Sequence, residues 1–97
     1  MSDAPETASV RRQVIYHGRV QGVCFRAISS ELARGFSVVG HVRNLFDGTV
    51  ELEAEGPEPE VDRFLAAVAT HFKDNITDAE TRAIPVRGDE SKFEITY

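Results

Sequence analysis

The sequence has no tryptophan, one cysteine and one methionine among its 97 residues. A single cysteine excludes a disulfide within the chain and fits a reducing compartment, so we expect a cytoplasmic protein. No apolar run approaches the roughly 20 residues that a membrane-spanning helix needs, so we expect no membrane partner. Basic residues are in deficit, because 11 lysines and arginines face 16 acidic residues, which gives a net charge of −5. This balance argues against a nucleic-acid partner.

The first ten residues also lack the basic start and apolar run of a signal peptide. Their serine, aspartate, proline, glutamate and threonine content predicts a mobile tail over residues 1–10. The remaining residues, 11–97, are enough for a single domain with one modest core.

Hydrophobic patterning predicts the order β-α-β-β-α-β with an added terminal strand. The expected strands cover residues 13–17, 37–44, 50–55, about 80–86 and 93–97, and the expected helices begin near Arg26 and after Pro57. A strand–helix–strand unit crosses over right-handed, and a hairpin partner can lie between its two strands. The fold class that follows is α+β, a ferredoxin-like βαββαβ sandwich with a mostly antiparallel sheet and two helices on one face.

The third expected strand alternates apolar and acidic residues. Val50, Leu52 and Ala54 are predicted to be buried, and the intervening glutamates are predicted to face solvent, namely Glu51, Glu53 and Glu55. The Asp47-Gly48 pair just before this strand is typical of a hairpin turn.

Residues 18–26, GRVQGVCFR, join the first expected strand to the first expected helix. Gly18 and Gly22 let the backbone turn tightly and bring N–H groups close to a ligand. The free N–H groups and positive dipole end of a helix N-terminus favour an anion, and the Arg26 guanidinium offers a fork shaped for two phosphate oxygens. The segment therefore predicts a phosphate-binding loop. Its candidate phosphate-binding residues are Arg19, Val20, Gln21, Gly22, Val23, Cys24, Phe25 and Arg26.

This loop resembles the signature loop of the acylphosphatases, small enzymes that hydrolyse the carboxyl–phosphate mixed anhydride. Residues 40–51, GHVRNLFDGTVE, resemble the family's other signature, in which an asparagine, here Asn44, closes a strand before a turn. The similarity runs from about residue 14 to residue 97 and departs from the family at His41, where tryptophan is usual. The resemblance implies the same ferredoxin-like fold, an acyl phosphate as substrate, and inorganic phosphate as product and inhibitor.

The resemblance also implies a mechanism in which Arg26 and Asn44 are the catalytic residues. The backbone N–H groups of residues 19–25 and the Arg26 guanidinium would hold the phosphoryl group. The Asn44 amide has both a donor and an acceptor, so it can hold a water that attacks phosphorus directly. Because an acyl phosphate has a good leaving group, we expect no metal, no cofactor and no covalent nucleophile. We also expect a monomer.

Three other interpretations apply to the same residues. Cys24 could be a covalent nucleophile, but only Phe25 separates it from Arg26, whereas cysteine phosphatases place a whole anion-binding loop between the two groups, so we interpret Cys24 as a packing residue. The chain could be a phosphate-sensing module without catalysis, or a nucleic-acid binder on the same kind of sheet, although the latter needs a basic face. The three histidines, His17, His41 and His71, lack the spacing of metal ligands.

Overall fold

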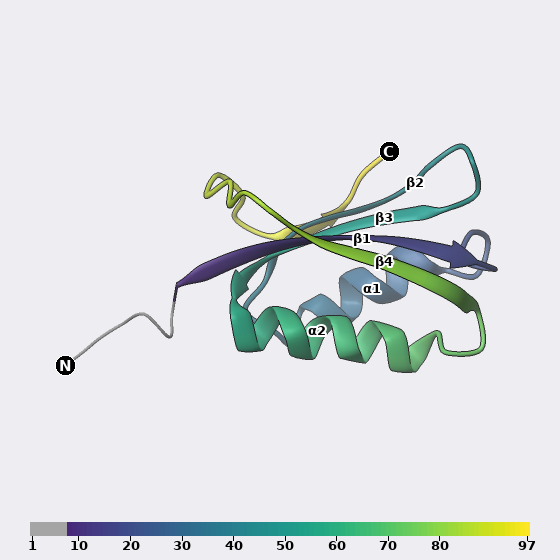
Figure 1. Cartoon of the computed structure of the whole chain (residues 1–97), viewed down its shortest axis with the longest axis horizontal. Coiled ribbons are helices and arrows are strands. Elements are labelled where there is room, and N and C mark those ends of the chain that lie inside the picture. The colour runs from purple at the N-terminus through teal and green to yellow at the C-terminus, as the bar shows by residue number, and fades with distance from the viewer. Residues whose placement is uncertain (1–7) are drawn as a thin grey trace.

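The computed structural model describes residues 8–97 and forms them into five strands and two helices. In chain order these are β1 (Ser9–Gly18), α1 (Phe25–Ala33), β2 (Val39–Asn44), β3 (Val50–Pro57), α2 (Glu58–His71), β4 (Ile76–Ile84) and β5 (Phe93–Ile95). The sheet has the strand order β4-β1-β3-β2-β5, and both helices cover the same face (Figure 1). Among the described strands, only β2 and β5 pair in parallel. The predicted ferredoxin-like fold is confirmed, and β3 lies between β1 and β2 as expected.

The strands differ in extent from the sequence prediction, and β1 and β4 differ most. β1 begins at Ser9, so residues 9 and 10 of the predicted tail belong to the sheet, where Ser9 pairs with Pro57 of β3. Of the rest of that predicted tail, residue 8 belongs to no strand or helix, and residues 1–7 lie outside the described residues. β4 begins at Ile76 rather than near Glu80, because it pairs with β1 over nearly the whole length of that strand. As an edge strand it has little apolar alternation to mark its start.

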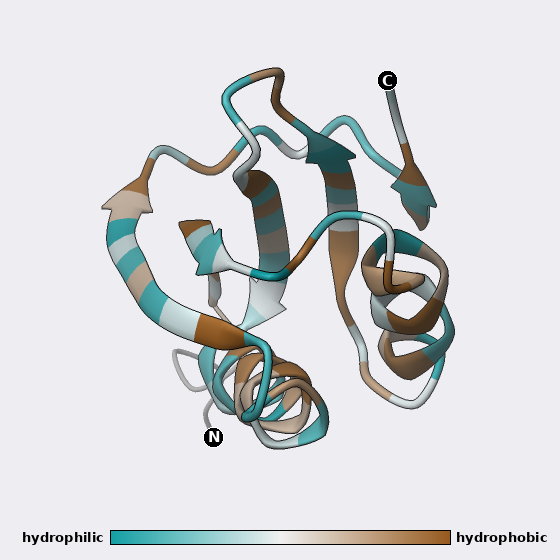
Figure 2. Cartoon of the chain, turned by 90° about the vertical axis from the view of Figure 1, so that its right-hand side faces the viewer, coloured by the Kyte–Doolittle hydropathy of each residue, from teal (hydrophilic) through white to brown (hydrophobic). Residues whose placement is uncertain are grey.

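The core lies between the sheet and the two helices. Figure 2 shows the strands banded alternately hydrophilic and hydrophobic, as expected when one face of a sheet is buried. At one end of the core the Phe25 ring lies 4.3 Å from the Phe72 ring and 5.0 Å from the Tyr16 ring, measured between centroids. Phe25 is the first residue of α1. The aromatic contacts therefore hold the start of α1 against the sheet and α2.

The prediction that the β3 glutamates face solvent is wrong. Glu51 and Glu55 are buried, at 7% and 5% exposure, although they point away from the helices. Arg11, which is also buried, pairs with Glu53, Glu55 and Glu90 over nitrogen–oxygen distances of 2.8, 3.0 and 2.6 Å. The backbone N–H groups of residues 87 and 88 also donate to the Glu55 carboxylate. The alternation of residues along β3 could not show that Arg11 of the neighbouring strand and the segment after β4 cover this face of the sheet.

No helix among residues 8–97 is long and apolar enough to cross a membrane.

Candidate active site

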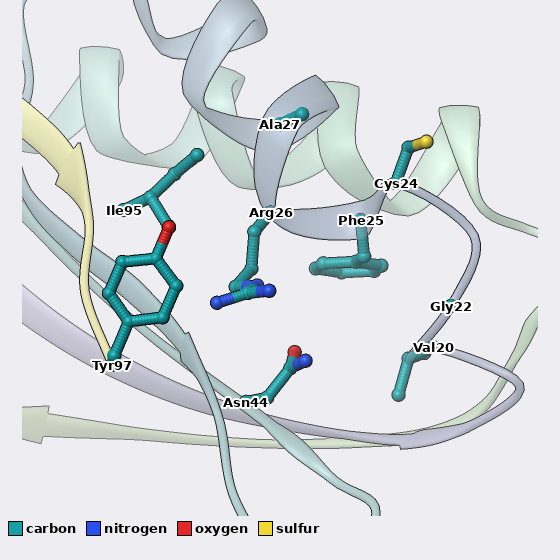
Figure 3. Close-up of a pocket in the computed structure, with 9 residues that line it drawn as sticks. All are labelled: Val20, Gly22, Cys24, Phe25, Arg26, Ala27, Asn44, Ile95 and Tyr97. Carbon is teal, nitrogen blue, oxygen red and sulfur yellow. The ribbon is translucent and has the colours of Figure 1, made fainter.

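A cavity of about 310 Å³ lies where the loop before α1, the end of β2 and the chain after β5 meet (Figure 3). Three segments far apart in the sequence therefore contribute to it. Its lining residues are Val20, Gly22, Cys24, Phe25, Arg26, Ala27, Asn44, Ile95 and Tyr97.

The loop between β1 and α1 is fixed at its first residues by the segment between α2 and β4. Gly18 has a φ of +119°, and a Cβ atom there would lie 2.3 Å from the carbonyl oxygen of Asn75. That same carbonyl accepts a 2.9 Å hydrogen bond from the Arg19 N–H. Only glycine allows this approach of the two backbones. The Arg19 N–H is thus already bonded, and the exposed Arg19 side chain is not among the residues that line the cavity, so a phosphate contact from Arg19 stays a prediction.

Beyond Arg19, loop residues that line the cavity alternate with residues that do not. Val20, Gly22 and Cys24 line the cavity, whereas Gln21 and Val23 do not, and Val23 packs on the core. Gly22 has a φ of +77°, and a Cβ atom there would meet no atom within 4 Å. The loop therefore presents open backbone to the cavity at this point.

The N-terminus of α1 opens on the same cavity. Cys24 is its N-cap, with a left-handed φ of +63°, and its side chain makes no capping hydrogen bond. Within residues 8–97, the backbone N–H groups of residues 22–26 donate to no backbone carbonyl. No acidic side chain occupies the first turn of this helix. Free N–H groups at a helix N-terminus form an anion-binding site, because the helix dipole places partial positive charge there.

Arg26 and Asn44 come together in this cavity from different elements. Arg26 is the second residue of α1 and Asn44 is the last residue of β2, and Figure 3 shows the guanidinium and the amide directed into the same space. The guanidinium carbon of Arg26 also lies 4.9 Å from the centroid of the Tyr97 ring. A cation over an aromatic face is stabilised by about 0.5–1 kcal/mol at an exposed site. The Tyr97 ring thus restricts the orientation of the arginine fork.

Ile95 and Tyr97 were not predicted as site residues from the sequence. β5 pairs in parallel with β2, with Ile95 opposite Val42, and the Thr96 N–H donates to the Val42 carbonyl over 2.9 Å. Continuing this register by two residues brings Tyr97 level with Asn44. The pairing joins chain segments about fifty residues apart, and no local pattern in the sequence marks it.

The structure corrects the interpretation of Cys24 and places the histidines elsewhere. Cys24 is exposed at the cavity wall rather than packed in the core. His17 lies 2.6 Å from the Glu80 carboxylate on the exposed side of the sheet, and His41 lies 3.1 Å from Glu51. None of the three histidines lines the cavity. His17 and His41 nevertheless each lie in a group of close carboxylates, His17 with Asp78 and Glu80 and His41 with Glu51 and Glu53, which their sequence spacing did not indicate.

Comparison with known proteins identifies the family of this chain. The family model for acylphosphatases matches residues 12–95. The chain belongs to the acylphosphatase family. An acylphosphatase of Clostridium acetobutylicum is 39% identical over 82 residues, which cover 82% of this chain and 89% of that protein. An acylphosphatase of Geobacillus thermodenitrificans is 40% identical over 89 residues, covering 90% and 94% of the two chains.

A solved acylphosphatase structure has the same fold as this chain. The crystal structure of the Bacillus subtilis acylphosphatase superposes with a TM-score of 0.80 at 32% identity, over 91% of this chain and 99% of that one. Membership in the acylphosphatase family makes this protein a hydrolase that acts on acyl phosphates.

Proposed function

We propose that this acylphosphatase transfers the phosphoryl group of an acyl phosphate directly to a water held by Asn44. The supporting observation is the convergence of Arg26, Asn44 and the free N-terminus of α1 on one cavity. In this proposal the backbone N–H groups of residues 22–26 and the Arg26 guanidinium bind the phosphoryl oxygens. Hydrogen bonds that involve a charged group contribute about 1.5–3 kcal/mol each, so several of them can hold the anion despite the acidic net charge.

Asn44 supplies the orientation of the nucleophile. Its amide oxygen accepts a hydrogen bond from the water and its amide nitrogen donates to a phosphoryl oxygen, so that a lone pair of the water faces phosphorus. The new oxygen–phosphorus bond forms as the bond between phosphorus and the acyl oxygen breaks. The products are a carboxylate and inorganic phosphate. Phosphoryl transfer depends mainly on such positioning and on stabilisation of charge.

The proton of the attacking water passes to a phosphoryl oxygen of the substrate. Within residues 8–97, no aspartate, glutamate or histidine side chain lines the cavity. A carboxylate leaving group is stable as an anion and needs no general acid. The mechanism therefore assigns no titratable side chain a role in proton transfer.

The substrate preference follows from this scheme. A phosphate monoester has a poor alkoxide leaving group, and in this scheme no side chain of the cavity acts as a general acid or as a covalent nucleophile. We expect turnover of benzoyl phosphate in the presence of a chelator, with at most trace turnover of p-nitrophenyl phosphate and ATP. Comparable rates on the monoester, or loss of activity with the chelator, would contradict the scheme. We further infer that the protein works as a monomer in the cytoplasm; sedimentation of the purified chain tests the first point, and fractionation of cells tests the second.

Substitution of Asn44 tests whether its amide acts in the chemical step or in phosphate binding. Asn44→Ala should lower kcat by about 10²–10³, the usual effect of losing one polar group in a preorganised site. The inhibition constant of inorganic phosphate should change little, because the loop and Arg26 still bind the anion. The measurement is kcat for benzoyl phosphate together with the phosphate inhibition constant. Equal losses in both would make Asn44 a binding or folding residue and remove the water-orienting role.

A further inference from the structure

Gln21 belongs to the phosphate loop in sequence, but its side chain does not line the cavity. Its amide nitrogen instead donates to two backbone carbonyl oxygens of the hairpin between β2 and β3, those of Leu45 at 2.6 Å and Thr49 at 2.9 Å. Both hydrogens of the side-chain amide are therefore used. We infer that Gln21 is a positioning residue that fixes Asn44 relative to the bound phosphoryl group, an inference that rests on the function proposed above.

The hairpin that Gln21 contacts is closed by its own hydrogen bonds. The Leu45 N–H donates to the Thr49 carbonyl, and the Gly48 N–H donates to the Leu45 carbonyl. The Asp47 carboxylate accepts from both the N–H and the hydroxyl of Thr49. Leu45 and Thr49, the two residues that accept from Gln21, are thus held to each other, and Leu45 directly follows Asn44 in the chain. Fixing this hairpin fixes the backbone that carries the Asn44 amide.

The Gln21 side chain connects the phosphate-binding loop directly to the hairpin that follows Asn44. The ladder between β1 and β3 ends with Tyr16 opposite Val50, and Val50 pairs on its other side with Asn44 of β2. Beyond this row of residues no strand ladder joins the loop, which turns toward α1, to the hairpin of residues 45–49, which directly follows Asn44. Because Gln21 joins these two segments, its loss would let the hairpin shift relative to the loop. A displacement of about 1 Å in a reacting group can cost about 10²-fold in rate.

The phosphate-binding half of the site has separate supports. The Arg19 N–H is bonded to Asn75, and the Phe25 ring packs between Tyr16 and Phe72. Removing the Gln21 donors should therefore leave the affinity for phosphate unchanged and act on kcat alone. This division distinguishes positioning of Asn44 from a general loosening of the loop.

The test is a double-mutant cycle between Gln21 and Asn44. Gln21→Met keeps a side chain of similar length and removes both donors. It should lower kcat for benzoyl phosphate about 10–100-fold, as expected for a misplaced reacting group, and change the phosphate inhibition constant less than about twofold. In the Asn44→Ala background the same substitution should have no further effect on kcat, because the group that it positions is already absent.

Gln13→Met is the matched control. Gln13 is also half-buried, and its amide donates to two carboxylate oxygens, of Glu51 and Glu53, on the face of the sheet away from the helices. This variant should retain the kcat of the unsubstituted protein even if its unfolding free energy falls as much as that of Gln21→Met. Gln21→Asn, which stays polar but is one methylene too short to bridge both carbonyls, provides a second measurement should the methionine variant not fold.

The possible outcomes separate the two proposals. If Asn44→Ala lowers kcat but Gln21→Met does not, or if the two losses multiply in the double variant, the Gln21 inference is wrong and the proposed function stands. A raised phosphate inhibition constant in Gln21→Met would also overturn the inference. If Asn44→Ala leaves kcat unchanged, both the water-orienting role and the positioning role are wrong.

Discussion

Arg26 is the only charged side chain that lines the cavity within residues 8–97. Its position at the start of a helix is unfavourable for the helix dipole, which prefers an anion there. The neighbouring Tyr97 ring offsets part of this cost and keeps the fork near Asn44. An arginine in such a position is better explained by a ligand anion than by the stability of α1.

Arg26→Ala should abolish measurable turnover. Losing two charge-assisted hydrogen bonds of about 1.5–3 kcal/mol each corresponds to a loss of roughly 10²–10⁴ in kcat/KM, and the phosphate inhibition constant should rise as well. Arg26→Lys should recover only part of the activity, because a lysine keeps the charge but lacks the planar fork. The measurement is kcat/KM for benzoyl phosphate and the inhibition constant for phosphate in both variants.

Cys24 provides the contrasting case at the residue scale. Its thiol is exposed at the cavity wall, and the mechanism gives it no bond to form. Cys24→Ala should therefore keep kcat within about twofold, because alanine keeps the backbone N–H at this position and Figure 3 shows the sulfur directed away from Arg26 and Asn44. An inactive but folded Cys24→Ala variant would instead indicate a covalent phosphoenzyme, which rapid acid quenching with labelled substrate could trap.

At the scale of elements, the loop before α1 depends on the close approach of β1 to the segment that leads into β4. A Cβ atom on Gly18 would lie 2.3 Å from the Asn75 carbonyl oxygen and 2.8 Å from the Thr77 nitrogen. Both contacts are with backbone, so neither can be relieved by a rotamer change. The register between β1 and β4 is also interrupted at this point.

Gly18→Ala should therefore destabilise the protein more than alanine at a glycine with a similar φ but open surroundings. Gly48, with a φ of +94° and no atom within 4 Å of a Cβ, is the matched control. We expect a cost of about 1–2 kcal/mol for Gly48→Ala from backbone strain alone. The steric clash at Gly18 should add roughly 1–3 kcal/mol. Urea unfolding of the two variants measures the difference, and equal losses would show that the Asn75 approach does not constrain the fold.

For the whole molecule, the buried charges between β1, β3 and the segment of residues 85–92 link stability to pH. Burial raises the pKa of Glu55, but hydrogen bonds from the N–H groups of Arg87 and Gly88 and from Arg11 outweigh it and hold the pKa below its ordinary value. Burial likewise raises the pKa of Glu51, and bonds from Arg43 and His41 outweigh it. A carboxyl whose pKa is lowered by folding stabilises the folded state above its unfolded pKa. That stabilisation is lost as the pH falls through the folded pKa.

We therefore expect the unfolding free energy to fall as the pH is lowered below about 4.5, near the ordinary pKa of glutamate. Glu55→Gln should be less stable at neutral pH by about 1.5–3 kcal/mol, because hydrogen bonds to a charged group are lost. It should also lose less stability on acidification, since one of the responsible carboxyls is absent. Urea titrations between about pH 7 and pH 3 measure both effects.

Asp62→Asn is the control for this comparison. It removes a carboxylate from an exposed pair with Arg12, and exposed pairs contribute only about 0–1 kcal/mol. Its loss of stability on acidification should match that of the unsubstituted protein. If Glu55→Gln behaves in the same way, the buried network does not cause the acid sensitivity.

The local parts of this protein could be predicted from its sequence. Turn chemistry at Asp47-Gly48, helical spacing of apolar residues in both helices, and the alternation in β3 depend on neighbours a few residues apart. The structure confirms the order of the elements for this reason, and Gly22, Arg26 and Asn44 line one cavity. The two glycines of the loop could also be interpreted locally, because positive φ angles are a property of the backbone itself.

The features that the sequence did not predict depend on pairing between residues that lie far apart in the chain. The register of β1 with β4 takes the Arg19 N–H away from the cavity, and the parallel pairing of β2 with β5 brings Tyr97 to Arg26. Burial of Glu51 and Glu55 likewise depends on residues from other strands and from the segment after β4. The sequence determines which backbone conformations and which faces are favoured within each element. Only the folded sheet determines which polar groups meet across elements, because the energy of a buried polar group depends on partners that lie far away in the chain.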